Sequence, residues 1–121
     1  MFAFRLAPLL LLVAAAPAEQ RIDIALSNFE FTPSTTTLEH DQAYVLHLSS
    51  TGGHSFAAKT FFAAAIMTAN ERAKVARGKI DLEGGESTDI HFIAPKPGTY
   101  AISCTHFLHS SFGMTGMFVV R

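Results

Sequence analysis

Short runs in which apolar and polar residues alternate recur along most of this 121-residue chain. Residues 22–26, 44–48 and 90–92 each show the pattern, and turn residues such as Gly84-Gly85 separate such runs. A period of two places alternate side chains on one face of a strand, so each run predicts a strand with one buried face. About seven or eight short strands in roughly 100 residues predict an all-β fold, a Greek-key β-sandwich.

One segment, about residues 61–77, breaks this alternation. It is rich in alanine, and Phe62, Ala65, Ile66 and Ala69 recur at helical spacing, with charged residues between them. Gly78 stands where a helix commonly ends. We therefore expect one α-helix over about 61–77, inserted between two strands and covering one side of the sandwich. Packing explains such a helix, and whether it also has a functional role stays open.

The N-terminal 18 residues have the composition of a secretory signal peptide. Arg5 provides a positive charge, residues 6–16 are almost entirely apolar, and Ala16-Pro17-Ala18 is a small-residue cleavage site. We expect residues 1–18 to be removed and residues 19–121 to form one domain that is periplasmic or otherwise exported. An uncleaved N-terminal anchor is the alternative. No later apolar run is long enough to span a membrane, so no span is expected after cleavage.

The charge balance bears on the kind of partner. The formal net charge is −1 at pH 7, and the basic residues are scattered along the sequence. This pattern does not favour nucleic acid as a partner. Nothing in the sequence requires an oligomer, so a monomer is expected.

The single cysteine lies in a cluster of metal-binding residue types. Cys104, His106, His109 and Met114 fall within eleven residues. A lone cysteine in an exported chain cannot form an internal disulfide, and a metal ligand is the simplest role for it. Thiolate, imidazole and thioether donors together favour copper.

A second imidazole from elsewhere would complete a copper site. Tyr100, Ile102 and Cys104 share one strand face, so the thiol is expected to point inward. His54 follows the Gly52-Gly53 break, and strands distant in sequence lie side by side in a Greek-key sandwich. Two imidazoles and a thiolate form a trigonal copper set, with a methionine as weak axial ligand.

These motifs resemble those of the cupredoxins, the small blue copper proteins that include plastocyanin, pseudoazurin and auracyanin. The family pattern, an early histidine and a late Cys-His-Met loop, maps onto His54, Cys104, His109 and Met114. The resemblance covers nearly the whole mature chain. It implies a cupredoxin-like sandwich, one type 1 copper ion, and electron transfer without an enzymatic reaction. It also implies docking of a redox partner, a cytochrome or an oxidase or reductase, on the apolar patch near His109, formed by Phe107, Leu108 and Phe112.

The chain departs from the family pattern in two ways. Relatives often carry an asparagine beside the first histidine that holds the cysteine loop, whereas this chain has Ser49, Ser50 and Ser55 in that neighbourhood. His106 is a rival for the second equatorial position, although the spacing favours His109.

Several alternatives remain at the level of sequence. Met117 competes with Met114, but its place in the last strand suggests packing. We expect His40, His47 and His91 to be away from the metal. A zinc site of Cys104, His106 and His109 would leave Met114 without a role. The second function considered is a copper chaperone or sensor that binds Cu(I) without electron transfer.

Overall fold

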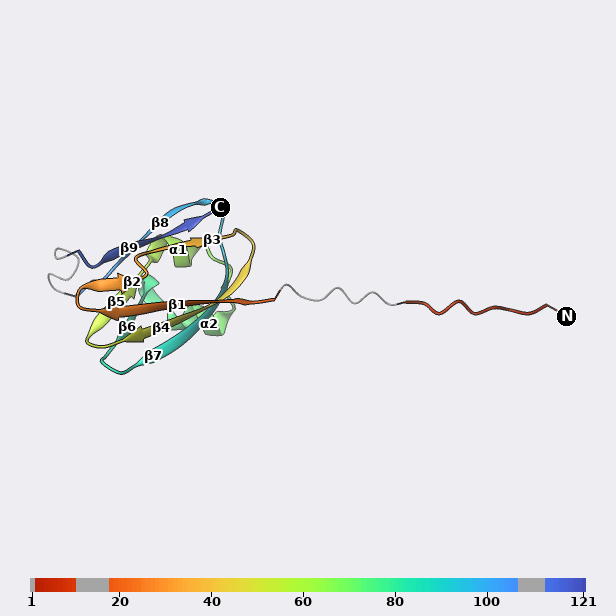
Figure 1. Cartoon of the computed structure of the whole chain (residues 1–121), viewed down its shortest axis with the longest axis horizontal. Helices are drawn as coiled ribbons and strands as arrows, with labels where there is room; N and C mark the ends of the chain where they lie inside the picture. The colour runs from red at the N-terminus through yellow and green to blue at the C-terminus, as the bar shows by residue number, and fades with distance from the viewer. Residues whose placement is uncertain (1, 11–17, 107–112) are drawn as a thin grey trace.

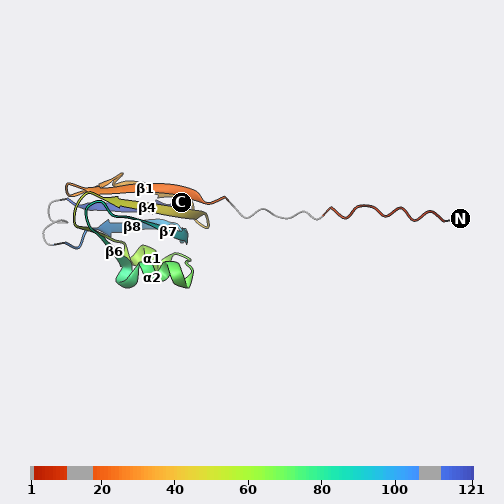
Figure 2. The same ribbon diagram turned by 90° about the horizontal axis from the view of Figure 1, so that it is seen from below.

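The computed structural model describes residues 2–10, 18–106 and 113–121, and nine strands of this part form two facing sheets (Figures 1 and 2). One sheet has the order β2-β1-β4-β7 and contains β2 (Glu30–Thr32), β1 (Gln20–Ser27), β4 (Ala43–Ser50) and β7 (Ser87–Ile93). The other has the order β3-β9-β8-β5-β6 and contains β3 (Thr35–Leu38), β9 (Thr115–Val120), β8 (Gly98–Ser103), β5 (His54–Ala57) and β6 (Lys79–Leu82). The prediction of an all-β sandwich is confirmed.

Alternating burial along the strands explains why the two sheets pack together. In β4, Tyr44, Leu46 and Leu48 are buried while the residues between them are partly exposed. The buried faces meet in a core with a cluster of aromatic rings. Phe61 lies at its centre, with its ring centroid 4.5 Å from that of Phe118 and 5.1 Å from that of Phe92. Burying such large rings supplies much of the hydrophobic free energy that holds the sandwich together.

The strand order places segments that are distant in sequence next to each other. β1 pairs with β4 and β3 pairs with β9 in parallel, while the remaining pairs are antiparallel. β5 lies between β6 and β8, and Ala57 pairs with Ser103. The ends of β5 and β8 therefore come together although nearly fifty residues separate them, and this antiparallel pairing places the start of β5 beside the residues that follow β8.

The inserted helix differs from its prediction, because the expected single helix over 61–77 is interrupted. The structure has α1 (Lys59–Ala64), α2 (Ala69–Lys74) and the short 3-10 turn η1 (Ala76–Gly78). Ile66 leaves the helix to exchange two backbone hydrogen bonds with Ile93, of 3.1 and 2.9 Å. Thr68 then caps α2 by accepting the Glu71 N–H at 3.3 Å. Pairing with the end of β7 thus overrides the helical pattern.

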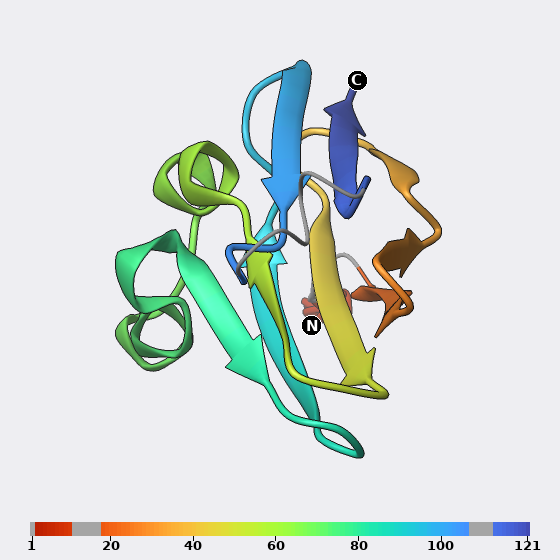
Figure 3. The same cartoon turned by 90° about the vertical axis from the view of Figure 1, so that its left-hand side faces the viewer.

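The two helices lie along one side of the sandwich, beside β6 (Figure 3). The inner side of α1 carries two buried residues, Phe61 and Phe62, whereas α2 has no buried residue. Arg72 of α2 donates to the carbonyls of Phe62 and Ala65 at 3.0 and 2.9 Å, which fixes the end of α1 against α2. In the described ranges no helix is long and apolar enough to cross a membrane.

Candidate metal centre

The thiol of Cys104 points into the protein at the end of a strand. Cys104 directly follows β8 and is 1% exposed, and Tyr100 and Ile102 on the same strand face are buried with it. The predicted inward orientation is confirmed. A buried thiolate needs hydrogen-bond donors or a cation to be stable, so its surroundings decide what it can do.

The residue that follows His54 contacts this sulfur directly. His54 is the first residue of β5 and is 7% exposed. The backbone N–H of Ser55 donates to Cys104 Sγ at 3.4 Å, and the Ser55 hydroxyl lies 3.7 Å from the same atom. The fold therefore brings the His54 and Cys104 positions to one place from two neighbouring strands.

Ser55 also connects β5 to the residues after β8. Its hydroxyl oxygen accepts the Thr105 N–H at 2.7 Å and lies 2.8 Å from the Thr105 hydroxyl. Ser55 is fully buried, so these bonds are shielded from water. At this position the sequence comparison with the family pattern indicated only that the usual asparagine is absent. The signal that could have identified Ser55 is the matched placement of two hydroxyl residues, one directly after His54 and one directly after Cys104.

Met114 closes the loop that begins at Cys104. The Cys104 N–H donates to the Met114 carbonyl at 3.2 Å, and Met114 is fully buried. Gly113 has a φ of +88°, a conformation that glycine adopts readily, as the chain turns back into β9. Met117 was expected to pack, but it is 39% exposed, so of these two methionines Met114 is the one that faces inward.

His106 lies beside Gly53 and β6. Its Nε2 is 3.9 Å from an Asp81 carboxylate oxygen, and a Cβ added to Gly53 would lie 3.5 Å from His106 Cε1. The Glu83 carboxylate borders the same glycine, 3.4 Å from such a Cβ. The His106 ring thus lies beside the Asp81 carboxylate, next to a glycine that the Glu83 carboxylate also borders.

His109 lies outside the described residues, as do Phe107, Leu108 and Phe112. The described part of the chain contains no group of three or more His, Cys, Asp or Glu side chains that could hold a metal ion. The described part contains three of the predicted donors, which are one histidine, one cysteine and one methionine thioether: His54, Cys104 and Met114. A complete site would therefore require a further donor, the position that the sequence assigns to His109.

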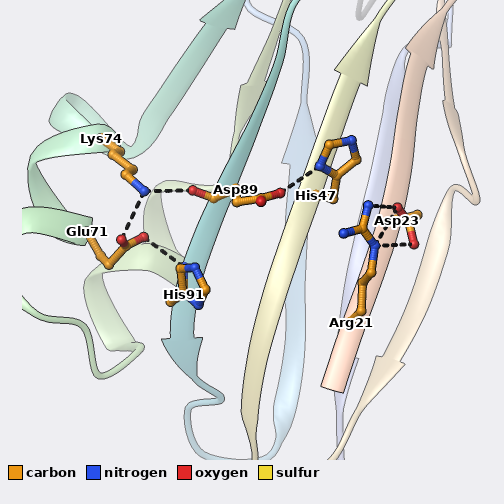
Figure 4. A network of polar contacts seen from close by, with 7 residues as sticks. All are labelled: Arg21, Asp23, His47, Glu71, Lys74, Asp89 and His91. Carbon is orange, nitrogen blue, oxygen red and sulfur yellow. Dashed lines mark hydrogen bonds and ion pairs between the residues drawn. The ribbon is translucent and has the colours of Figure 1, made fainter. Parts of the chain in front are cut away.

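His47 of β4 and His91 of β7 lie on the outer face of the four-stranded sheet (Figure 4). His47 Nδ1 lies 2.6 Å from Asp89 Oδ1, and this hydrogen bond lowers the pKa of the Asp89 carboxyl. His91 Nδ1 lies 2.8 Å from a Glu19 oxygen, and its backbone N–H donates to Glu71 at 2.8 Å. The predicted outward orientation of His47 and His91 is confirmed.

Glu71 shows how closely this outer face is paired. Burial raises its pKa, but the hydrogen bonds from the His91 N–H and from Lys74 outweigh burial, and the pKa is lowered. Lys74 Nζ also donates to the Asp89 carbonyl at 2.9 Å, which ties α2 to β7.

The fold is similar to that of solved auracyanins. Dithionite-reduced auracyanin from the photosynthetic bacterium Roseiflexus castenholzii is 25% identical with a TM-score of 0.62, and the match covers 86% of this chain and 98% of that chain. Auracyanin B is 19% identical, with a TM-score of 0.61 and coverage of 90% and 93%. Auracyanin A from Chloroflexus aurantiacus, described as a "blue" copper protein, is 18% identical, with a TM-score of 0.60 and coverage of 86% and 100%.

The sequence itself matches no protein-family model and no curated protein. The likeness to auracyanins extends over both sheets, because it covers nearly all of the chain that follows the N-terminal segment. The expectation of a cupredoxin-like sandwich is confirmed. The chain is a cupredoxin-like protein.

Proposed function

We propose that this chain is an exported protein that binds one type 1 copper ion and carries single electrons. The ligands are His54, Cys104, His109 and Met114. The likeness to auracyanins, one of them a blue copper protein, supports the coarse assignment of copper binding and electron transfer. The protein acts as a carrier between partners and not as an enzyme.

One observation carries the proposal. The residue next to His54 donates a hydrogen bond to Cys104 Sγ at 3.4 Å, while the Cys104 N–H donates to the Met114 carbonyl at 3.2 Å. Two of the four ligand positions, Cys104 and Met114, are therefore joined by a direct hydrogen bond, and His54 is held beside them through its neighbour Ser55 although about fifty residues separate it from Cys104.

The donor chemistry fits copper. Cys104 and Met114 are buried sulfur donors and His54 is a buried imidazole, a set that copper accepts in both oxidation states. Bound copper would supply the one-electron couple between Cu(II) and Cu(I). The chain's own residues hold the donors in place: Ser55 positions the sulfur, and its hydroxyl fixes Thr105. A framework that moves little between the two states keeps the reorganisation energy low.

The N-terminal segment is part of the proposal. Residues 1–18 are a signal peptide, and residues 19–121 form the functional domain in the periplasm or another exported space. Intact mass and N-terminal sequencing of the protein from its natural compartment test this, and we expect a chain that begins at Glu19. A chain that retains residues 1–18 would instead support an N-terminal anchor.

A redox partner protein, a cytochrome or an oxidase or reductase, docks near His109 on the surface formed by Phe107, Leu108 and Phe112. The protein works as a monomer at this surface. Substituting Phe107 or Phe112 by Ser is expected to slow electron transfer to the partner while leaving the copper spectrum unchanged, because these side chains are not ligands.

A copper chaperone or sensor that binds Cu(I) is the second candidate, because two buried sulfur donors also suit Cu(I). Voltammetry separates the two functions. A carrier has a reversible one-electron couple with fast electron exchange, whereas a chaperone binds Cu(I) tightly and transfers the ion to an acceptor without such a couple.

Optical and EPR spectra of copper-loaded wild type, His106→Ala and His109→Ala test the ligand set. We expect intense blue absorption in the wild type and in His106→Ala, and its loss in His109→Ala. Metal analysis of protein purified without added metal distinguishes copper from zinc. A colourless Cu(II) complex of the wild type would overturn the proposal.

A further inference from the structure

The basic residues look scattered along the sequence, but in the structure those without an acidic partner gather in one place. Eight lysines and arginines follow residue 18. Four of them form ion pairs, which are Arg21 with Asp23, Lys74 with Glu71, Lys79 with Asp81, and Arg121 with Glu39. Within the described residues, the four that have no carboxylate partner are Lys59, Arg72, Arg77 and Lys96.

Three of these four cations line a single hollow. Lys59, Arg72 and Arg77 surround a hollow of about 220 Å³ between α1, α2 and η1. Its remaining walls are apolar or backbone, provided by Phe62, Ala63, Val75 and Gly78. Among the residues that the structure describes, no acidic side chain lines it. Lys96, the fourth cation, lines a neighbouring hollow together with Lys59.

The backbone holds two of the cations close together. The Ala58 N–H donates to the Gly78 carbonyl at 2.9 Å, and a Cβ added to Gly78 would lie only 2.6 Å from the Lys59 Cα. Gly78 is therefore required for Lys59 and η1 to approach each other. Arg77 has a φ of +61°, a left-handed conformation that costs energy for a residue with a side chain. Lys59 and Arg77 thus reach the same hollow through a constrained backbone.

The third cation is held rigidly. Arg72 donates its two terminal nitrogens to the Phe62 and Ala65 carbonyls, so its guanidinium keeps its place beside the hollow with its full charge. Like charges that are held together repel each other, and an anion between them would remove that repulsion. Two exposed cations and one fixed cation around a small hollow are arranged to surround a compact anion.

We propose that the hollow of Lys59, Arg72 and Arg77 binds a phosphate group. Arginine and lysine are the side chains that recognise phosphate, arginine through its forked donors and lysine as a point charge. The phosphate belongs either to a small free phosphate compound or to the headgroup of an anionic lipid. His54 is the first residue of β5, whereas Lys59 begins α1 after the far end of that strand, so this site is separate from the candidate metal centre.

The test titrates the purified chain with inorganic phosphate and with vesicles, and follows backbone amide shifts by NMR. One vesicle preparation contains phosphatidylglycerol and the other phosphatidylcholine alone, and chloride at equal ionic strength controls for screening. We expect saturable shifts at Lys59, Arg77 and Gly78. Lys59→Gln and Arg77→Gln should each weaken binding about tenfold. Both side chains are exposed and form no hydrogen bond to another described residue, so these variants should fold.

Lys79→Gln is the matched control, because it removes the same charge close by from a lysine that is paired with Asp81. Saturation by inorganic phosphate assigns a free phosphate compound, and binding only to the phosphatidylglycerol vesicles assigns a lipid headgroup. Absence of saturable shifts in both titrations overturns the proposal. So does binding that Lys79→Gln weakens as much as Lys59→Gln and Arg77→Gln do, since this would indicate attraction to net charge alone.

Discussion

Two groups of histidines in this protein differ in what surrounds their rings. At one end of the sandwich His54 is buried, and Ser55, the residue that follows it, contacts Cys104 Sγ and the Thr105 hydroxyl through its backbone N–H and its own hydroxyl. On the outer face of the four-stranded sheet, His47 and His91 are each paired with a carboxylate (Figure 4).

The difference shows that neighbours, more than residue type, decide what an imidazole does. A ring that is already bonded to a carboxylate in solvent stabilises the surface only weakly and is a poor start for a copper site. The buried His54 ring, whose neighbour Ser55 contacts a thiol, is largely shielded from water. The carboxylate-paired rings tie parts of the four-stranded sheet together. The buried ring near a thiol is suited to binding a soft metal ion.

The largest effect is expected when the sulfur of the buried region is removed. Cys104→Ser keeps the size of the side chain but replaces the thiolate, so the copper protein should lose its blue absorption completely. Optical spectra of copper-loaded wild type and variant measure this. Thermal unfolding of the metal-free proteins controls for the fold. Because the chain has only one cysteine, retained blue colour in the variant would show that the colour does not come from a thiolate of this chain.

Exchanging the histidines tests the comparison directly. His54→Ala should lower copper affinity by more than tenfold and change the EPR spectrum, because an equatorial donor is lost. His47→Ala is the control from the outer face and should leave both unchanged. Competition titration against a copper chelator measures the affinities. Equal losses in the two variants would show that burial beside Cys104 is not what defines the site.

Ser55→Ala tests the buried region more finely, because it removes only a hydroxyl. The Thr105 N–H would lose its acceptor, so the free energy of unfolding should fall by about 1–3 kcal/mol. Copper affinity should fall about tenfold, since the sulfur loses part of its support. Urea unfolding and copper titration measure the two effects. Ser49→Ala, in partly exposed β4 surroundings, provides the control and should change neither.

The smallest effect concerns the outer face. The hydrogen bond from His47 lowers the pKa of Asp89 below its usual 3.8, so the pair adds stability above pH 3.8 and loses it as the pH falls through the lowered pKa. Asp89→Asn should therefore reduce the melting temperature slightly near pH 6, with the difference disappearing in strong acid. A difference that persists below pH 2 would show that the carboxylate charge is not its source.

The sequence predicted most of the sandwich because alternation is a local property that the core then uses. Ile22, Ile24 and Leu26 are buried as their spacing required. β5 was not predicted as a strand, since His54, Ser55 and Phe56 are all buried and do not alternate. The prediction of one continuous helix was wrong for a related reason. Ile66 pairs with Ile93, a partner that no local pattern reveals.

The site was predictable only in part. The inward orientation of Cys104 followed from strand periodicity, but the bonds of Ser55 depend on how β5 lies beside β8, which sequence spacing does not encode. His109 remains a prediction from spacing.

The hydrogen bond from Cys104 to Met114, together with the pairing of Ser103 and Thr115, forms a narrow neck where the chain leaves and re-enters the sheet. Because this neck and Thr105 are held by the framework, the residues between Thr105 and Met114 can be exchanged as long as a histidine is kept for the proposed His109 ligand. Grafting loops of other lengths there would then change the surroundings of the proposed copper ion while leaving the two sheets intact. The same arrangement lets the loop sequence vary during evolution at little cost to the stability of the two sheets.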